Sequence, residues 1–119
     1  MITNILYEAV DEVNGAQFAG VIGTDGLPVQ IIAADDDLPV NIEEIEHELA
    51  QMTSALSRSA GRLGSGLVQD MVIESEELTY LASLVIPGYF AVLGITAEGN
   101  LGRARFAVHR MVYRLQSEL

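Results

Sequence analysis

The stretch that decides the fold is Tyr89 to Ile95 (YFAVLGI), followed by Gly99-Asn100-Leu101-Gly102 and then by arginines at positions 103, 105, 110 and 114. The first seven residues carry no charge and do not alternate, which predicts a strand buried on both faces near the centre of a sheet. The glycines indicate a turn. Beyond it, apolar residues recur at helical spacing: Leu101, Ala104, Val108, Val112 and Leu115. The stretch therefore predicts a central strand that leads through a turn into an amphipathic, arginine-rich helix.

Two shorter patterns lie near the N-terminus. Residues 2–13 carry an apolar stripe at helical spacing, which predicts a first helix. The apolar runs 18–22 and 29–34 flank Thr24-Asp25-Gly26, and an Asp-Gly pair between such runs is typical of a β-hairpin. Pro28 cannot donate a backbone hydrogen bond, so we expect the second strand of this hairpin to lie at a sheet edge.

The middle of the chain predicts one long helix. Asn41 followed by Glu44 has the form of a capping box, in which each side chain bonds the backbone of the other residue. From there, apolar residues follow a three-four spacing over about six turns: Ile42, Ile45, Leu49, Met52, Leu56 and Leu63. A second line holds small residues at the same spacing: Ala50, Ser54, Ser57 and Gly61. Such a line permits close approach of another backbone, but Ala and Ser are also ordinary residues of a helix surface.

Three strands are expected after Gly64-Ser65-Gly66 ends the long helix. The first, residues 67–75, alternates only in part and places Asp70 and Glu74 on one face, as in an edge strand. Residues 78–86 form the next strand, and the central strand and the final helix complete the chain. The predicted order is α-β-β-α-β-β-β-α, in a single α+β domain that spans residues 1–119.

The amino-acid composition excludes several classes of function. Half of the 119 residues are hydrophobic, which suits one domain with a core of its own. Seventeen acidic residues against six arginines give a net charge of −11, so the protein would repel nucleic acid. The absence of lysine excludes a P-loop and a Schiff-base amine, and the absence of cysteine excludes disulfides and thiolate metal sites. The apolar runs are far shorter than the ~18 residues of a membrane span, and the N-terminus has no signal-peptide pattern. We therefore expect a soluble cytoplasmic protein.

Three local patterns suggest metal or cofactor chemistry, and each fails on its spacing. A calcium loop starting at Asp35-Asp36-Asp37 would need glycine at its sixth position, where the sequence has Val40. His47-Glu48 begins a zinc-protease motif, but Gln51 stands where the second histidine belongs. The glycines at 61, 64 and 66 follow a helix and precede a strand, which is the reverse of a dinucleotide-binding turn. We expect no metal, no cofactor and no catalytic residues, and hence a protein that is not an enzyme.

The assembled pattern resembles the roadblock family, of the dynein-light-chain type that also occurs in bacteria and archaea. Its marks are Gly20-Val21-Ile22-Gly23-Thr24-Asp25-Gly26-Leu27-Pro28, the long helix after an acidic linker, and Asn100-Leu101-Gly102-Arg103-Ala104-Arg105. The resemblance covers nearly the whole chain. It implies a five-stranded antiparallel sheet in the order 2-1-5-4-3, with the long helix on one face and the two terminal helices on the other. It also implies homodimers, or heterodimers with a paralogous roadblock protein, built by pairing the third strands and the long helices.

The same resemblance implies a function without catalysis. Family members regulate or scaffold Ras-like small GTPases, including the bacterial gliding-motility type, and others are dynein light chains or lysosomal scaffold subunits. We expect a dimeric, non-catalytic regulator of a small GTPase. The alternatives are a structural scaffold without a role at a nucleotide switch and a sensor that holds a small ligand. The strong acidity and the lack of lysine differ from many relatives, so the identity of the partner does not carry over.

Two sets of residues are expected at interfaces. The dimer interface would combine the small-residue line with the edge strand: Ala50, Ser57, Gly61, Val68, Asp70, Val72 and Glu74. The GTPase would meet the outward residues of the long helix: Glu44, His47, Gln51, Ser54, Arg58 and Arg62. Charge along that helix runs from acidic to basic, which would orient an approaching partner. Arginines 103, 110 and 114 can share one face of the last helix, where we expect them to pair with surface acids.

Overall fold

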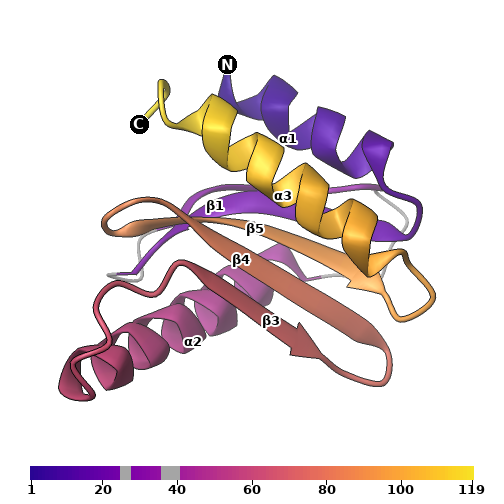
Figure 1. The fold of residues 1–119 in the computed structure, drawn as a ribbon. Coiled ribbons are helices and arrows are strands. Elements are labelled where there is room, and N and C mark those ends of the chain that lie inside the picture. The colour runs from indigo at the N-terminus through magenta and orange to yellow at the C-terminus, as the bar shows by residue number, and fades with distance from the viewer. Residues whose placement is uncertain (25–27, 36–40) are drawn as a thin grey trace.

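The computed structural model describes residues 1–24, 28–35 and 41–119. Within these residues, a five-stranded antiparallel sheet separates one long helix from two shorter ones (Figure 1). The helices are α1 (Ile2–Glu12), α2 (Ile42–Arg62) and α3 (Leu101–Leu115). The strands are β1 (Ala16–Gly23), β2 (Pro28–Ala33), β3 (Asp70–Glu74), β4 (Leu78–Ile86) and β5 (Tyr89–Thr96). The α+β class and the order of elements predicted from the sequence are confirmed.

The strands of the described sheet follow the order β2-β1-β5-β4-β3, as the resemblance implied. The two most apolar strands, β1 and β5, lie in the middle and pair with Gly20 opposite Val92. Pro28 is the first residue of β2, at an edge of the sheet, which is where a strand tolerates a residue without an N–H. The last two residues of the turn predicted at Thr24-Asp25-Gly26 lie outside the described part of the chain.

Alternation along the strands divides the core into two layers. The larger layer joins α1 and α3 to the sheet, and its most buried members include Leu6, Val21, Leu93, Met111 and Leu115. The smaller layer lies beneath α2 and includes Phe18, Ile22, Leu49, Ala82, Phe90 and Val92. Two helices thus cover one face of the sheet, and α2 alone covers the other (Figure 1).

Close packing of the two central strands requires the glycine at position 94. Gly94 of β5 lies opposite Phe18 of β1, and a Cβ at this glycine would lie 2.1 Å from Cε2 of the phenylalanine ring. Phe18 is fully buried, and protein interiors are packed too densely for a ring to move aside freely. The ring therefore rests on the bare backbone of Gly94.

Asparagine side chains cap the starts of α2 and α3. Oδ1 of Asn41 accepts a hydrogen bond from the Glu44 N–H at 3.1 Å, and Oδ1 of Asn100 accepts one from the Arg103 N–H at 2.9 Å. These bonds satisfy amide groups that the first turn of a helix leaves without a partner. The Asn41 half of the predicted capping box is confirmed.

Two elements differ from expectation. The apolar stripe of α2 is buried at Leu49, which is 2% exposed, but Leu56 and Leu63 are 43% and 81% exposed. The reason is that α2 packs chiefly across β1 and β2, so its other flank extends beyond the covered part of the sheet. The strand predicted over residues 67–75 is shorter, Asp70–Glu74, because the ladder with β4 runs only from Asp70, opposite Ser83, to Glu74, opposite Thr79.

Candidate functional site

The two edge strands of the described sheet are β2 and β3, and β3 pairs with β4 alone; β2 is contacted by α1 and α2, so we call β3 the open edge. Backbone groups at such an edge are a template for another strand. Along β3 the side chains alternate: Met71 and Ile73 pack into the layer beneath α2, whereas Asp70, Val72 and Glu74 are exposed on the other face. The three residues predicted from this strand therefore share one face, with a valine between two carboxylates.

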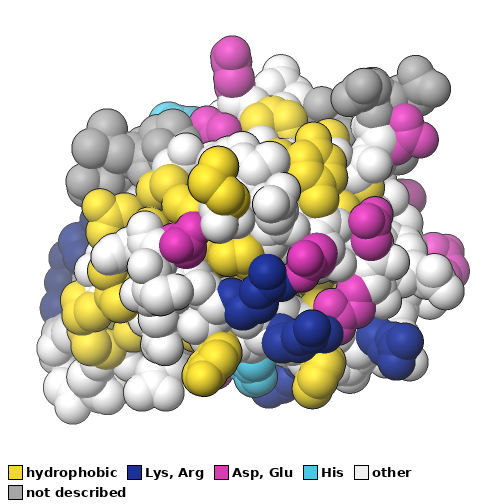
Figure 2. Space-filling view, turned by 90° about the horizontal axis from the view of Figure 1, so that it is seen from above, with side chains coloured by type: hydrophobic (Ala, Val, Ile, Leu, Met, Phe, Trp, Pro, Cys, Tyr) yellow, Lys and Arg dark blue, Asp and Glu magenta, His cyan; other side chains and the backbone are white. Residues whose placement is uncertain are grey.

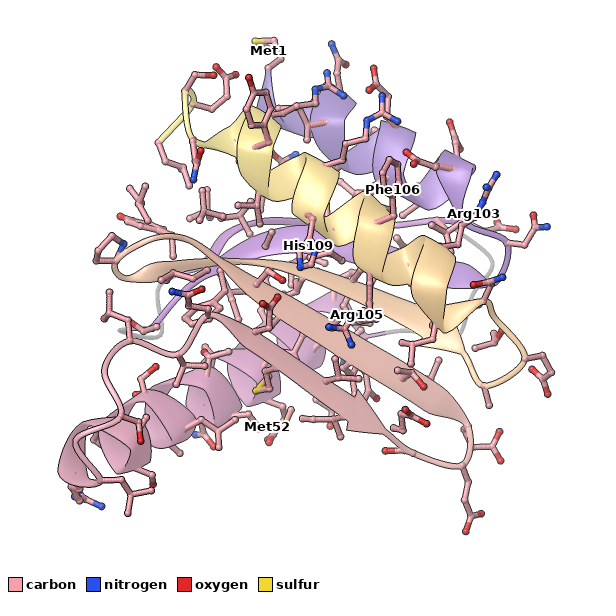
Figure 3. The ribbon with its side chains drawn as sticks, viewed as in Figure 1. Met1, Met52, Arg103, Arg105, Phe106 and His109 are labelled. Atoms are coloured by element: carbon pink, nitrogen blue, oxygen red, sulfur yellow. The ribbon has the colours of Figure 1, made fainter. Side chains whose placement is uncertain are left out.

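The face of the sheet beneath α2 is only half covered. On β4, the residues that face α3 are buried, whereas Leu78, Tyr80 and Leu84, which face α2, remain half-exposed. A hollow of about 310 Å³ lies between this part of the sheet and α2, and its lining includes Ile45, Met52 and Tyr80. Figure 3 shows Met52 reaching from α2 toward the underside of the sheet. Apolar side chains of one protomer thus remain accessible beside the open edge.

The small-residue line of α2 does not lie on this flank. Ala50 is 4% exposed and is buried within its own protomer. Its expected place in a dimer interface stays a prediction, and the burial of Ala50 within its own chain does not favour it. Ser57 is half-buried and Gly61 is exposed, and both line a separate hollow of about 550 Å³ together with Val68.

The flank of α2 that faces the uncovered strands was missed as a surface, because its residues follow the predicted core stripe. Met52 and Leu56 lie seven and eleven residues after Ile45, which places all three along one side of the helix. The centre of the buried face lies instead at Leu49 and Thr53, which are each 2% exposed. The hydroxyl of Thr53 donates to backbone carbonyls of its own helix, which satisfies it without a distant partner. Nothing in the sequence therefore marks Thr53 as a residue at the centre of the buried face.

The residues predicted to meet a GTPase lie on the outer surface of α2: Glu44, His47, Gln51, Ser54, Arg58 and Arg62. All are exposed except Ser54, which is half-buried. Nε2 of Gln51 lies 3.0 Å from Nε2 of His47, and Nη1 of Arg58 donates to Oγ of Ser54 at 2.8 Å. Burial, and after it the nearby charge of Glu43, raises the pKa of Glu46. The first half of the helix is thus crowded with carboxylates, and its last turns carry arginines.

On the opposite face, Asp70 connects β3 to β4 and α3. Its Oδ1 accepts hydrogen bonds from Oγ of Ser83 at 2.5 Å and from Nε2 of His109 at 3.1 Å. Figure 3 shows His109 and Arg105 pointing from α3 toward these strands. Burial alone would raise the pKa of Asp70, but the two hydrogen bonds and the charges of His109 and Arg105 outweigh burial and lower the pKa. The carboxylate ties the edge strand to α3.

This cluster contains the residue types of a hydrolase triad without its arrangement. In a triad the histidine lies between the serine and the carboxylate, so that it can take the proton of the serine. Here Asp70 lies between Ser83 and His109, so the geometry activates no nucleophile. Over residues 1–24, 28–35 and 41–119, no three His, Cys, Asp or Glu side chains are grouped to bind a metal, and no helix is long and apolar enough to cross a membrane.

Asp70→Asn should destabilise the fold at neutral pH and leave it unchanged in strong acid. The pKa of Asp70 is lower in the folded protein than in the unfolded chain. The ionised group therefore contributes stability above the unfolded pKa, and this contribution is lost as the pH falls through the folded pKa. The side chain is 47% exposed, so solvent screening limits the loss to about 1 kcal/mol or less. Urea unfolding, carried out at neutral pH and at a pH well below the ordinary pKa of aspartate, measures this loss of stability. Glu74→Gln on the same strand is the control, and an equal loss at both pH values would contradict this account.

Comparison with known proteins shows which solved structures share this fold. No family model matches the sequence, and no curated protein matches it. MglC from Myxococcus xanthus is 29% identical, with a TM-score of 0.73 and 100% of both chains covered. A Roadblock/LC7 domain from Streptomyces avermitilis is 20% identical, with a TM-score of 0.76 over 96% of this chain and 93% of that one. The gliding protein MglB from Thermus thermophilus is 20% identical, with a TM-score of 0.85 over 98% of this chain and 86% of that one.

The described sheet, with one long helix on one face and the two terminal helices on the other, has the architecture of a roadblock domain. The sequence marks at residues 20–28 and 100–105 and the full-length match to MglC agree with this architecture. The chain therefore has a roadblock fold and resembles the roadblock family in these sequence marks.

Proposed function

We propose that this protein is a homodimeric, non-catalytic regulator of a Ras-like small GTPase. The observation that carries the proposal is the half-covered face of the sheet beside the open edge of β3. The family resemblance supports the GTPase, because roadblock dimers of this kind act on or beside small GTPases. The likeness to MglC and to the gliding protein MglB also supports a small GTPase as the partner.

In the proposed dimer, the β3 strands of two protomers pair across a two-fold axis and extend the sheet. The second α2 then lies alongside the first, over the strands that the first leaves uncovered. The apolar flanks of the two helices, with Ile45, Met52 and Leu56, pack against each other in an isologous interface. Each Å² of apolar surface that becomes buried contributes roughly 25 cal/mol.

The acids of β3 fit this arrangement. An axis through Val72 would place Asp70 of one protomer opposite Glu74 of the other, on the face away from α2. Like charges in directly opposed positions destabilise a strand pair. His109 and Arg105 lie beside Asp70 and offset the repulsion, so the network on α3 makes the strand pairing compatible with two carboxylates.

The two α2 helices would form a broad platform for the GTPase. Their outward residues include Glu44 near the start and Arg58 and Arg62 near the end, so the platform carries an oriented field. Such fields steer encounter and select orientation more than they add affinity. The opposite face of the sheet is already covered by α1 and α3 (Figure 1).

The double variant Arg58→Glu, Arg62→Glu should weaken binding of the cognate GTPase about tenfold or more, because it reverses the charge at one end of the platform. The dimer and the fold should persist, since both arginines are exposed and point outward. Titration of a small GTPase that co-purifies with the protein, at low and high salt, measures the change. The matched control is Arg110→Glu, Arg114→Glu on α3. Unchanged affinity in the α2 variant together with lost affinity in the α3 variant would place the GTPase on the other face.

One further measurement separates regulator from scaffold. GTP hydrolysis and nucleotide exchange by the bound GTPase are followed with and without this protein. A changed rate supports regulation, and tight binding with both rates unchanged supports a scaffold that does not act on the nucleotide switch.

A further inference from the structure

The outer surface of α3 carries exposed aromatic and basic side chains that the proposed GTPase platform on α2 does not use. We propose that it is a second docking surface, on the opposite side of the sheet from α2, for an acidic amphipathic segment of a partner protein. We call it the α3 ridge and define it by six exposed residues: Arg103, Arg105, Phe106, His109, Arg110 and Tyr113.

Two aromatic side chains form the crest of the α3 ridge. Phe106 is 62% exposed and Tyr113 is 79% exposed. They are seven residues apart, about two turns, so they lie on one line of the helix. Figure 3 shows Phe106 pointing away from the sheet. A single exposed apolar residue is ordinary on a protein surface. Two aromatic rings on one line supply anchors of the kind enriched at protein interfaces.

Cationic side chains flank the crest on both sides. Toward α1, Nη1 of Arg110 lies 3.4 Å from a carboxylate oxygen of Glu12, and Arg103 lies two turns earlier on the same side. Toward β3, Arg105 and His109 lie beside Asp70. Figure 2 shows arginine side chains gathered along one side of the face that α1 and α3 form, with both hydrophobic and acidic side chains beside them. The crest is therefore apolar, and each slope carries basic side chains, of which Arg110 and His109 are paired with carboxylates.

The charge of the α3 ridge selects the partner. Four of the six arginines of a chain with net charge −11 lie on α3. In the part of the chain that the structure describes, ion pairs engage His109, Arg110 and Arg114 of α3, whereas Arg103 has no carboxylate within ion-pair distance and Arg105 interacts with Asp70 only through its charge. A guanidinium group binds a carboxylate through two parallel hydrogen bonds, which fits Glu and Asp side chains of a docked segment. Apolar side chains of the same segment would pack on Phe106 and Tyr113.

Other occupants fit less well. A second copy meeting this face across a two-fold axis would set arginines against arginines. An extended polyanion, such as nucleic acid or an anionic membrane surface, would approach the acidic remainder of the protein as well as the ridge. A short acidic segment engages the ridge alone.

A defined probe tests the proposal on the intact protein. The probe is a labelled synthetic helical peptide with leucines on one face and glutamates on the other. In the control peptide, every glutamate is replaced with lysine. We expect the glutamate peptide to bind, with an affinity that falls as salt rises. The variants Arg103→Glu, Arg105→Glu and Phe106→Ser, Tyr113→Ser should each weaken binding about tenfold or more. Arg58→Glu, Arg62→Glu, the same change of charge on α2, should leave it unchanged.

Several results would overturn the proposal. No binding of the glutamate peptide, equal binding of the lysine peptide, or an equal loss in the α2 variant overturns the proposal. Binding to vesicles that contain phosphatidylserine, abolished by Arg103→Glu, Arg105→Glu, would assign the ridge to a membrane instead. Altered sedimentation of Phe106→Ser, Tyr113→Ser would assign it to a second copy of the chain. All the changed side chains are exposed, and circular dichroism checks that each variant is folded.

Discussion

Leu56→Asp should convert the proposed dimer into a monomer without unfolding the protomer. Leu56 is 43% exposed in the protomer and lies with Ile45 and Met52 on the flank of α2 that faces the uncovered strands. A carboxylate there costs little in a single chain, since water reaches it. In the dimer it would be buried without a partner, which costs about 4 kcal/mol and weakens association roughly a thousandfold. Sedimentation velocity at micromolar concentration measures the change.

The matched control for this variant is Ala55→Asp. Ala55 is exposed, precedes Leu56 on the same helix and faces away from the uncovered strands, so the same added charge should leave the dimer intact. If the unmodified protein sediments as a monomer, or if both variants dissociate equally, the proposed interface is wrong.

Gly94→Ala should destabilise the protein by about 3 kcal/mol, at the upper end of what overpacking of a core produces. The added methyl group would overlap the ring of Phe18, which is fully buried in the core layer beneath α2 and cannot move aside freely. Urea unfolding, with the midpoint and the slope measured separately, gives the loss. Gly61→Ala is the control: its new Cβ meets nothing within 4 Å, and in a helix it should be neutral or stabilising by about 0.5–1 kcal/mol.

A second change at Phe18 identifies the cause. Phe18→Leu removes part of the ring and should cost stability by itself. Combined with Gly94→Ala, however, it should make the alanine much less harmful, because the two side chains then share the space. Strictly additive losses would mean that the glycine is required for a reason other than this contact.

The layers of the fold could be predicted because each strand has its own signature. The run from Tyr89 to Ile95 lacks alternation, as a strand covered on both faces must, and it lies in the middle of the sheet. Pro28 predicted an edge correctly, since proline cannot complete a ladder. The strand order itself came from the family resemblance, because periodicity states which faces are buried and not which strands are neighbours.

The interaction surfaces could be predicted only in part. An apolar stripe on a helix looks the same whether its own protomer or a second chain covers it, so the place of Leu56 on the stripe did not reveal that it would be exposed in a single chain. The pairing of α3 arginines with surface acids is confirmed for Arg110 and Arg114, which meet Glu12 and Glu8 of α1. The contact of Asp70 with His109 joins residues 39 positions apart, and no local pattern announces it. Such contacts depend on how elements cross, which spacing along a single chain does not specify.

Because of the uncovered strip of sheet beside β3, the stability of this protein should depend on its concentration. Where a second copy completes the cover, folding and association become one equilibrium, and the resistance of each molecule to heat rises with its concentration. A dilute sample would hold protomers whose bare edge can recruit strands from unrelated chains. If the proposed dimer forms, the abundance of this protein is part of what keeps it folded, and halved synthesis would lower the stability of every remaining copy.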